Sequence, residues 1–234
     1  MKRRLQRKLD RSRRATNPDN YADNGTIRRG VKLTHNKSNR YRRTQRELRY
    51  LQHCQAEIRK RQHIELANHL LALGDCFYVE DMAWPSLTHR AKETAISEKT
   101  GRIKRKKRFG KSVANKAPAT LIGILEQKCN SLGLPGVMKV PTSLRASQYN
   151  HQSGEYTSKP LSQRWNNMPD GERIQRDLYS AFLLQHYDPK AGNFDSALLQ
   201  QDYPQFVQYH HRAIQRLSTV PKTLSSMGIQ RSLR

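Results

Sequence analysis

The sequence predicts an α/β fold in which basic helices precede a small sheet and further helices follow it. Apolar residues recur at helical spacing across residues 38–73 and 118–132. Two short apolar segments, 76–80 and 137–140, have the length and composition of buried strands. Helical and strand segments that alternate in this way are typical of an α/β domain.

The charge distribution favours a polyanionic partner. The 234 residues carry a formal net charge of +25, with +15 in residues 1–61 and +9 in residues 89–117. Residues 62–88, by contrast, contain no Lys or Arg and four acids. Self-repulsion of this size is normally offset by nucleic acid, although each basic run taken alone could be a solvated face. The residues expected to contact nucleic acid are Arg13, Arg14, Arg42, Arg43, Arg46, Lys104, Arg105, Lys106, Lys107 and Arg108.

Several classes of protein are excluded by what the sequence lacks. No stretch approaches 18 consecutive apolar residues, so no membrane-spanning helix is expected. The basic N-terminus has no apolar core after it, unlike a secretory signal. Cys54, Cys76 and Cys129 are widely spaced and form no CxxC pair, so we expect a reducing cytosol, no disulfide framework and no zinc.

Residues 1–73 are predicted to form a basic helical hairpin. Residues 1–15 are predicted to be the end of a basic helix, and a loop rich in turn residues follows at 17–25. The second helix spans about 38–73, with an apolar stripe through Tyr41, Leu48, Leu51 and Ile58 and basic residues on its other faces. The alternative is an amphipathic hairpin that is simply solvated.

Residues 74–187 are predicted to form the second region. Gly74-Asp75 ends the long helix, and the strand 76–80 stops at Glu80. Residues 89–117 form a basic loop that is too long for an ordinary connection. A helix over 118–132, the strand 137–140 and an irregular stretch at 147–164 come next, in that order.

The C-terminal part is predicted to be helical with a loose end. A helix over 172–187 carries the apolar stripe Ile174, Leu178, Ala181 and Phe182. Residues 188–234 are expected to be a helical extension, with two short helices in 195–217 broken at Pro204. The last fifteen or so residues are expected to be a flexible tail.

Two carboxylates are candidate metal ligands. Glu80 ends an apolar strand, and Asp177 follows Ile174 by three residues, which predicts a position near the packed face. Carboxylates from separate elements can together hold Mg²⁺ for phosphoryl displacement. The alternatives are a solvated strand end for Glu80, and for Asp177 a surface ion pair with Arg173 or Arg176.

Three motifs resemble the RuvC nuclease of the TnpB family, which bacterial insertion sequences encode and which is related to type V CRISPR effectors. Val79-Glu80-Asp81-Met82 at a strand end resembles the second acidic motif. Ala146-Ser147-Gln148 is similar to the family's Thr-Ser-Gln, and Arg176-Asp177-Leu178-Tyr179-Ser180-Ala181 resembles the third acidic motif, Arg-Asp-x-x-x-Ala. The resemblance covers about residues 1–187.

This resemblance implies an RNase H-like fold and a Mg²⁺-dependent DNA endonuclease that is guided by RNA. Glu80 and Asp177 would then be catalytic metal ligands, two of the three carboxylates that bind Mg²⁺ in the family. The basic helices and residues 104–108 would face guide RNA or displaced DNA. The implied location is the bacterial cytoplasm, in association with the nucleoid.

The sequence departs from the family at two places. The first family carboxylate lies in an Asp-x-Gly strand upstream of the basic helices, whereas Met1 here opens within them. Asp10 lies in a basic helix and Asp81 is expected to turn away from Glu80, so neither replaces it. No cysteine follows Ser147-Gln148 where the family has a zinc ribbon, and His151 alone is expected to be a surface histidine.

The expected fold is therefore α/β, a partial RNase H-like (RuvC) domain with a protruding basic helical hairpin and extra C-terminal helices. Three functions stay open. The chain is a nuclease whose N-terminal portion is missing or is supplied by a partner chain, or it is a catalytically inactive nucleic-acid-binding remnant or regulator. The third is a basic RNA-binding protein, such as a ribosomal accessory factor.

Overall fold

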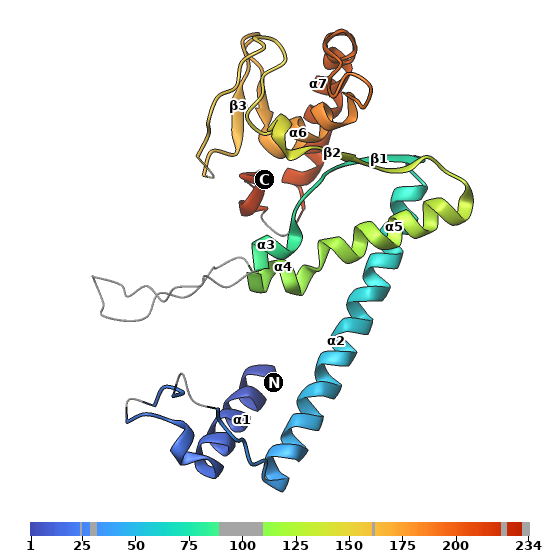
Figure 1. The fold of residues 1–234 in the computed structure, drawn as a ribbon. Coiled ribbons are helices and arrows are strands. Elements are labelled where there is room, and N and C mark those ends of the chain that lie inside the picture. Colours follow the sequence, from blue (N-terminus) through green and yellow to red (C-terminus); the bar gives the residue numbers. More distant parts are fainter. Residues whose placement is uncertain (24, 29–31, 89–109, 161, 221–223, 231–234) are drawn as a thin grey trace. The chain divides into compact units, whose positions relative to one another are not determined.

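The chain was analysed as a computed structural model, which describes residues 1–23, 25–28, 32–88, 110–160, 162–220 and 224–230 (Figure 1). It divides into two compact units, Met1–His69 and Leu70–Arg234. None of the helices in the described ranges is both long and apolar enough to cross a membrane.

Unit 1 is built from two basic helices that run antiparallel. Helix α1 spans Lys2–Thr16, a 3-10 turn follows at Pro18–Asn20, and α2 spans Asn39–Leu71, so its last two residues belong to unit 2. The start of α1 lies near Glu47, while the Oγ atoms of Ser12 and Ser38 are 3.1 Å apart. Both helices lie close to their predicted bounds.

Polar side chains rather than a large core hold unit 1 together. Asn17 is buried, and its side chain bonds the backbone of Asn36 twice, donating to the carbonyl at 3.0 Å and accepting from the amide at 2.6 Å. Buried Asn20 donates to the carbonyl of Thr34 at 2.7 Å. Among the described residues of this unit, Leu5 and Ala67 are the buried apolar side chains. The side-chain amides of Asn17 and Asn20 therefore hold residues 34–36, which lead into α2, against the end of α1.

The sheet of unit 2 is a parallel pair, β1 (Cys76–Glu80) and β2 (Gly136–Val140), aligned so that Glu80 lies opposite Val140. Parallel strands need a crossover connection, and α5 (Pro118–Leu132) supplies it after the short helices α3 (Trp84–Thr88) and α4 (Gly110–Lys116). Gly133 ends α5 in the left-handed region, with φ of 67°. Both strands and α5 were predicted, and the structure confirms them.

The predicted helix over 172–187 is wrong at its start. Residues Arg173–Gln175 form β4, which pairs antiparallel with β3 (Trp165–Asn167), a strand that directly follows the stretch predicted to be irregular and was not itself predicted. Helix α6 therefore begins at Arg176 and ends at Gln185. The Gln175 side chain caps it by accepting from the amide of Leu178 at 2.8 Å. A further two-residue pairing joins β5 (Tyr187–Asp188) and β6 (Asn193–Phe194).

The C-terminal prediction needs two corrections. Instead of two helices broken at Pro204, one helix, α7, runs from Ser196 to Ser218 through that proline. Pro204 removes one backbone hydrogen bond, but buried Leu199 and Tyr203 anchor the turn before it to the core.

The tail is not loose where the structure describes it, at residues 224–230. Buried Ile229 and a 3-10 turn at Ser225–Met227 lie there, and the Trp165 indole donates to the carbonyl of Gly228 at 3.0 Å. Gly228 has φ of 71°, and a Cβ atom there would lie 2.6 Å from Cβ of Arg164. This close approach requires glycine.

The core of unit 2 lies around α6 and α7, on the side of the β1–β2 pair opposite α5 (Figure 1). Phe182 stacks on Phe206 with ring centroids 4.4 Å apart. Ala181, predicted to be in the apolar stripe of α6, is instead exposed, because Ile174 lies on β4 and does not define the buried face of the helix. The buried core residues are Ala146, Met168, Ile174, Tyr179, Phe182, Leu183, Phe194, Leu199 and Tyr203.

Candidate functional site

Glu80 lies at the C-terminal end of β1, beside a hollow of about 250 Å³. Its side chain is half-buried, and no hydrogen bond or ion pair to its carboxylate occurs among the described residues. The hydrogen bonding between β1 and β2 continues one residue beyond Glu80, since the amide of Asp81 donates to the carbonyl of Val140 at 2.8 Å. The hollow is lined by Val79, Glu80, Asp81, Met82, Trp84, Ala119, Ile122, Gly123, Glu126 and Lys139.

Acidic residues outnumber cations around this hollow. Glu126 and Lys139 form an exposed ion pair of 3.2 Å, which leaves Glu80 and Asp81 as additional negative charges. Asp81, which was expected to turn away from Glu80, is exposed and is also one of the residues that line the hollow. The excess of carboxylates suits a cation rather than an anion.

Asp177 lies in the first turn of α6, and its side chain is 48% exposed. The expected position near the packed face is therefore wrong. The buried face of α6 passes through Arg176, Tyr179 and Leu183 instead, because the residues before Arg176 form a strand. A carboxylate in the first turn is favoured by the helix dipole.

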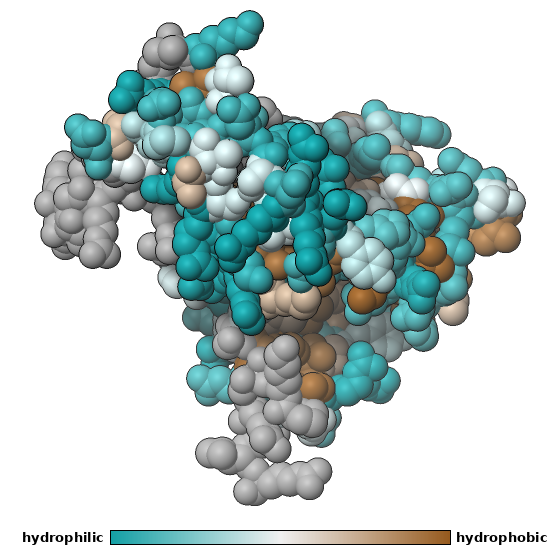
Figure 2. All heavy atoms as spheres, turned by 90° about the horizontal axis from the view of Figure 1, so that it is seen from below, coloured by the Kyte–Doolittle hydropathy of each residue, from teal (hydrophilic) through white to brown (hydrophobic). Residues whose placement is uncertain are grey.

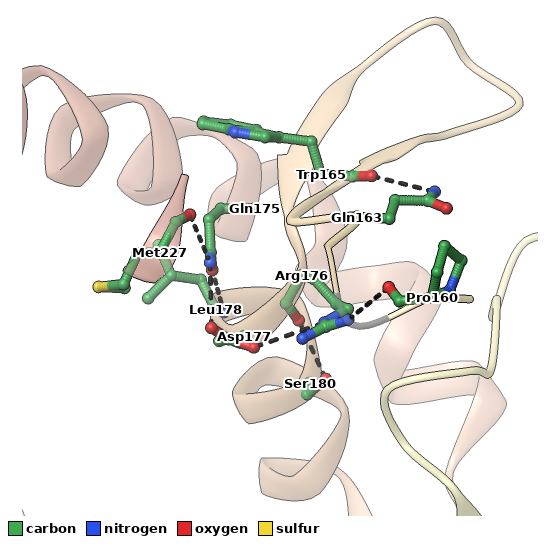
Figure 3. A network of polar contacts seen from close by, with 9 residues as sticks. All are labelled: Pro160, Gln163, Trp165, Gln175, Arg176, Asp177, Leu178, Ser180 and Met227. Atoms are coloured by element: carbon green, nitrogen blue, oxygen red, sulfur yellow. Dashed lines mark hydrogen bonds and ion pairs between the residues drawn. The ribbon is translucent and has the colours of Figure 1, made fainter. Parts of the chain in front are cut away.

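Gln175 connects Asp177 to three other parts of unit 2 (Figure 3). Its side chain is fully buried, and Nε2 donates both to Oδ2 of Asp177 and to the carbonyl of Met227, each at 3.2 Å. Its backbone amide donates to Nε2 of His210 at 3.0 Å. One residue thus joins the end of β4, the start of α6, α7 and the C-terminal segment.

The bond from Gln175 fixes the protonation of His210. An amide can only donate, so Nε2 of His210 accepts and its imidazole is neutral in this arrangement. Burial is the main cause that lowers the pKa of His210 to about 4, with a smaller contribution from the charge of His211.

Arg176 lies beside Asp177 and is buried (Figure 3). Its Nε is 3.6 Å from Oδ1 of Asp177, and Nη1 donates to the carbonyl of Pro160 at 3.4 Å. Arg173, the other partner considered for Asp177, instead lies over the Trp165 ring at 5.1 Å. Burial and the charge of Arg176 lower the pKa of Lys159. The interpretation of Asp177 as part of an ion pair therefore holds for Arg176.

The structure brings the elements of Glu80 and Asp177 together, since α6 contacts β1. Asp177 does not line the hollow beside Glu80. No group of three or more His, Cys, Asp or Glu side chains is placed to hold a metal ion in the described ranges. The described chain therefore offers two candidate oxygen ligands on neighbouring elements.

His151 was expected to be a surface histidine, and this is wrong. It is buried, with Nδ1 2.7 Å from the hydroxyl of Tyr179 and its ring 4.6 Å from that of Tyr203. Burial lowers the pKa of His151. The residue belongs to the aromatic core of unit 2, which its polar sequence neighbours did not indicate.

The predicted nucleic-acid-binding arginines differ in how they are held. Arg13 and Arg14 pair with Asp10 at 3.3 and 3.2 Å, and Arg14 also lies over the Tyr21 ring. Arg42, Arg43 and Arg46 are exposed on α2. The predicted residues Lys104, Arg105, Lys106, Lys107 and Arg108 lie outside the described residues.

Sequence reasoning missed two sets of residues. Lys8, Arg11 and Arg40 line a hollow between α1 and α2. The signal was present in α1, where Lys8 and Arg11 lie on one face with the small residues Ser12, Ala15 and Thr16. Gln175 and His210 had no comparable signal, because their bonds depend on how distant segments meet.

A scan against models of known protein families finds no match, and a search of curated proteins finds none either. Function is therefore inferred from the motifs, the fold and the charges of the chain.

Proposed function

We propose that the chain is a TnpB-like protein with a RuvC-type site, in which Glu80 and Asp177 hold Mg²⁺ for endonucleolytic hydrolysis of DNA paired to a guide RNA. One observation carries the proposal. Glu80 ends a strand of a parallel β–α–β unit, and Asp177 opens a helix that contacts that strand. The acidic motifs that resemble the family thus lie on neighbouring elements.

The donor set suits the proposed ion. Mg²⁺ prefers oxygen ligands and is commonly held by one or two carboxylates together with waters and substrate phosphates. Glu80 has no competing partner among the described residues, and Asp177 is half exposed with its carboxylate at a helix start. When bound, the ion would lower the pKa of a water and stabilise charge on the phosphodiester.

The protein's own residues would orient these ligands. Gln175 holds Oδ2 of Asp177 by a hydrogen bond from a fully buried amide. Arg176 balances the charge of the same carboxylate from its other side. A ligand fixed from both sides loses less conformational freedom when a metal binds.

The RNase H-like fold is part of this proposal. In the described residues β1 pairs with β2 alone, which leaves the opposite edge of β1 without a partner strand. A strand that carries the third carboxylate implied by the resemblance would pair with this edge, adjacent to Glu80. Unpaired edges of apolar strands are normally covered or blunted.

A second candidate function is nucleic-acid binding without cleavage. It is favoured by the net charge of +14 in residues 1–69, which suits a polyanion and requires no metal site. In this case the basic helices of unit 1 would carry the function, and the carboxylates would serve only the fold.

The test uses the full chain, expressed from its coding sequence with the flanking DNA included. The protein is purified with the RNA that stays bound to it. The target is duplex DNA that matches the bound RNA, incubated with Mg²⁺ or with EDTA. We expect Mg²⁺-dependent cleavage that falls by about 10³-fold or more in Glu80→Gln and Asp177→Asn, because each removes several kcal/mol of charge stabilisation. The matched control is Asp75→Asn, an exposed carboxylate just before the other end of β1, which should cleave like the unchanged chain.

The outcomes separate the two candidates. Cleavage that survives in both carboxylate variants contradicts the proposed site. RNA and DNA binding without cleavage in any divalent metal ion supports the second candidate.

A further inference from the structure

The hollow between α1 and the first turn of α2 combines cations with small side chains. It measures about 390 Å³ and is lined by Lys8, Arg11, Ser12, Ala15, Thr16 and Arg40. The five residues of α1 follow one helical face, at spacings of three and four. Three cations, Lys8, Arg11 and Arg40, thus line the hollow together with small residues. Figure 2 shows strongly hydrophilic side chains over much of the face seen from below.

Within the described part of the chain these three cations have no acidic partner, unlike Arg13 and Arg14 of the same helix. In the described residues no ion pair involves Lys8, Arg11 or Arg40. Arg13 and Arg14, on the other side of the same helix, both form ion pairs with Asp10, which offsets one of their two charges. The structure thus leaves unpaired the cations that face the hollow.

The geometry of the hollow is fixed by polar bonds. The hydroxyls of Ser12 and Ser38 meet at 3.1 Å, and Asn17 bonds the backbone of Asn36 twice. Residues 1–69 carry 20 Lys and Arg against 6 Asp and Glu, a net charge of +14. Holding two such helices side by side is unfavourable until an anion offsets the repulsion.

We propose that this hollow binds backbone phosphates of a nucleic-acid strand. The guanidinium groups of Arg11 and Arg40 can each donate two hydrogen bonds to phosphate oxygens, and the ammonium group of Lys8 supplies a point charge. Phosphate contacts position a strand without reading its bases, so the site has no sequence preference. The proposal deepens the proposed function and rests on it for nucleic acid as the partner, but it does not require cleavage.

The test is the salt dependence of binding by the full chain in EDTA, which prevents metal-dependent cleavage. The probes are single-stranded RNA, single-stranded DNA and duplex DNA of one sequence, each of about 20 nucleotides per strand, long enough for several phosphate contacts. The hollow variant is Lys8→Gln/Arg11→Gln/Arg40→Gln. The matched control, Lys190→Gln/Arg212→Gln/Arg216→Gln, removes the same charge from exposed positions of unit 2, outside the basic helices.

We expect the hollow variant to bind at least about 10-fold more weakly, with a log–log salt slope reduced by about 2, since each phosphate contact contributes about 0.7–0.9. The control should weaken binding by no more than about 3-fold, because it changes only long-range attraction. The conservative variant Lys8→Arg/Arg11→Lys/Arg40→Lys should keep most of the slope. Circular dichroism would verify that all variants are equally helical.

Equal losses in the hollow variant and the control would overturn the proposal, as would an unchanged slope in the hollow variant. A loss confined to the hollow variant supports it, and the probe that shows the largest loss identifies the strand. Because the assay contains no divalent metal, this result stands or falls separately from the cleavage experiment on Glu80 and Asp177.

Discussion

In unit 1 two buried asparagines and a pair of serines join the helices, whereas in unit 2 a cluster of aromatic and aliphatic side chains surrounds α6 and α7. The first arrangement leaves most side chains of two basic helices in solvent. The second arrangement buries whole rings and fixes the start of α6 through Gln175. Hydrogen bonds between polar side chains are enough to join two helices that expose cations to solvent. The position of a single carboxylate, Asp177, instead depends on a packed core.

The difference also separates the two functions that we propose for the chain. Unit 1 offers unpaired cations around an open hollow, which suits a backbone that is bound by charge. Unit 2 offers carboxylates on elements whose positions the core determines. Changes to the two units should therefore have different consequences, and three predictions follow in order of expected size.

The largest effect is expected in the core of unit 2. Leu199 is fully buried, so Leu199→Ala should lower the free energy of unfolding by about 2–5 kcal/mol through lost burial and a new cavity. The matched change in unit 1 is Ile58→Ala, an exposed apolar residue of α2, which should stay within about 0.5 kcal/mol. Urea unfolding monitored by circular dichroism measures both. Equal effects would contradict the proposed division between a packed and a polar unit.

A smaller effect is expected from acid. Burial lowers the pKa of His210 to about 4 in the folded chain, whereas a histidine in the unfolded chain has a pKa of about 6.5. The unfolded chain therefore binds the proton more tightly, and protonation favours unfolding. The stability that depends on neutral His210 is present above that range and is lost as the pH falls. Between pH 7 and pH 5 the loss should be about 2 kcal/mol.

The variant His210→Gln tests this origin of the pH dependence. A glutamine can still accept a hydrogen bond from the amide of Gln175, but it does not titrate. Urea unfolding at the two pH values should therefore show a flatter dependence in the variant. An undiminished dependence would assign the effect to other groups, such as buried His151.

The smallest effect is expected in unit 1. Asn17→Ala removes both bonds to the backbone of Asn36 and should destabilise this unit by about 1–2 kcal/mol, since the freed backbone groups regain water. Hydrogen exchange at residues 34–38 would report the local opening. Added salt should restore part of the protection by screening the repulsion among the cations. Gln52→Ala, at an exposed position of α2, serves as the control.

The sequence by itself determined the elements whose signals are local. The strand ending at Glu80 and the helix over Pro118–Leu132 follow from a short apolar run, a proline at the first helical position and a glycine after the last. The composition likewise separates a strongly basic N-terminal region from a less charged remainder. Each of these features depends on residues within a few positions of one another.

Only the tertiary structure decided how Asp177 and the cations are presented. Pairing of Arg173–Gln175 with Trp165–Asn167 converted the expected first helical turn into a strand, and this placed Asp177 in solvent. Core packing around Leu199 and Tyr203 carried α7 through Pro204. Asp10 formed ion pairs with both Arg13 and Arg14, while Lys8 and Arg11 on the same helix stayed unpaired beside Arg40.

The physical reason is that local propensities differ by about 1 kcal/mol or less per residue, whereas burying a side chain or leaving a polar group unsatisfied changes the free energy of folding by about 1–3 kcal/mol. Gln175 illustrates this, because two of its hydrogen bonds, to His210 of α7 and to Met227 of the C-terminal segment, join residues 35 and 52 positions away and cannot be read from its sequence neighbours. Where distant segments compete for the same residue, their contacts determine its structure.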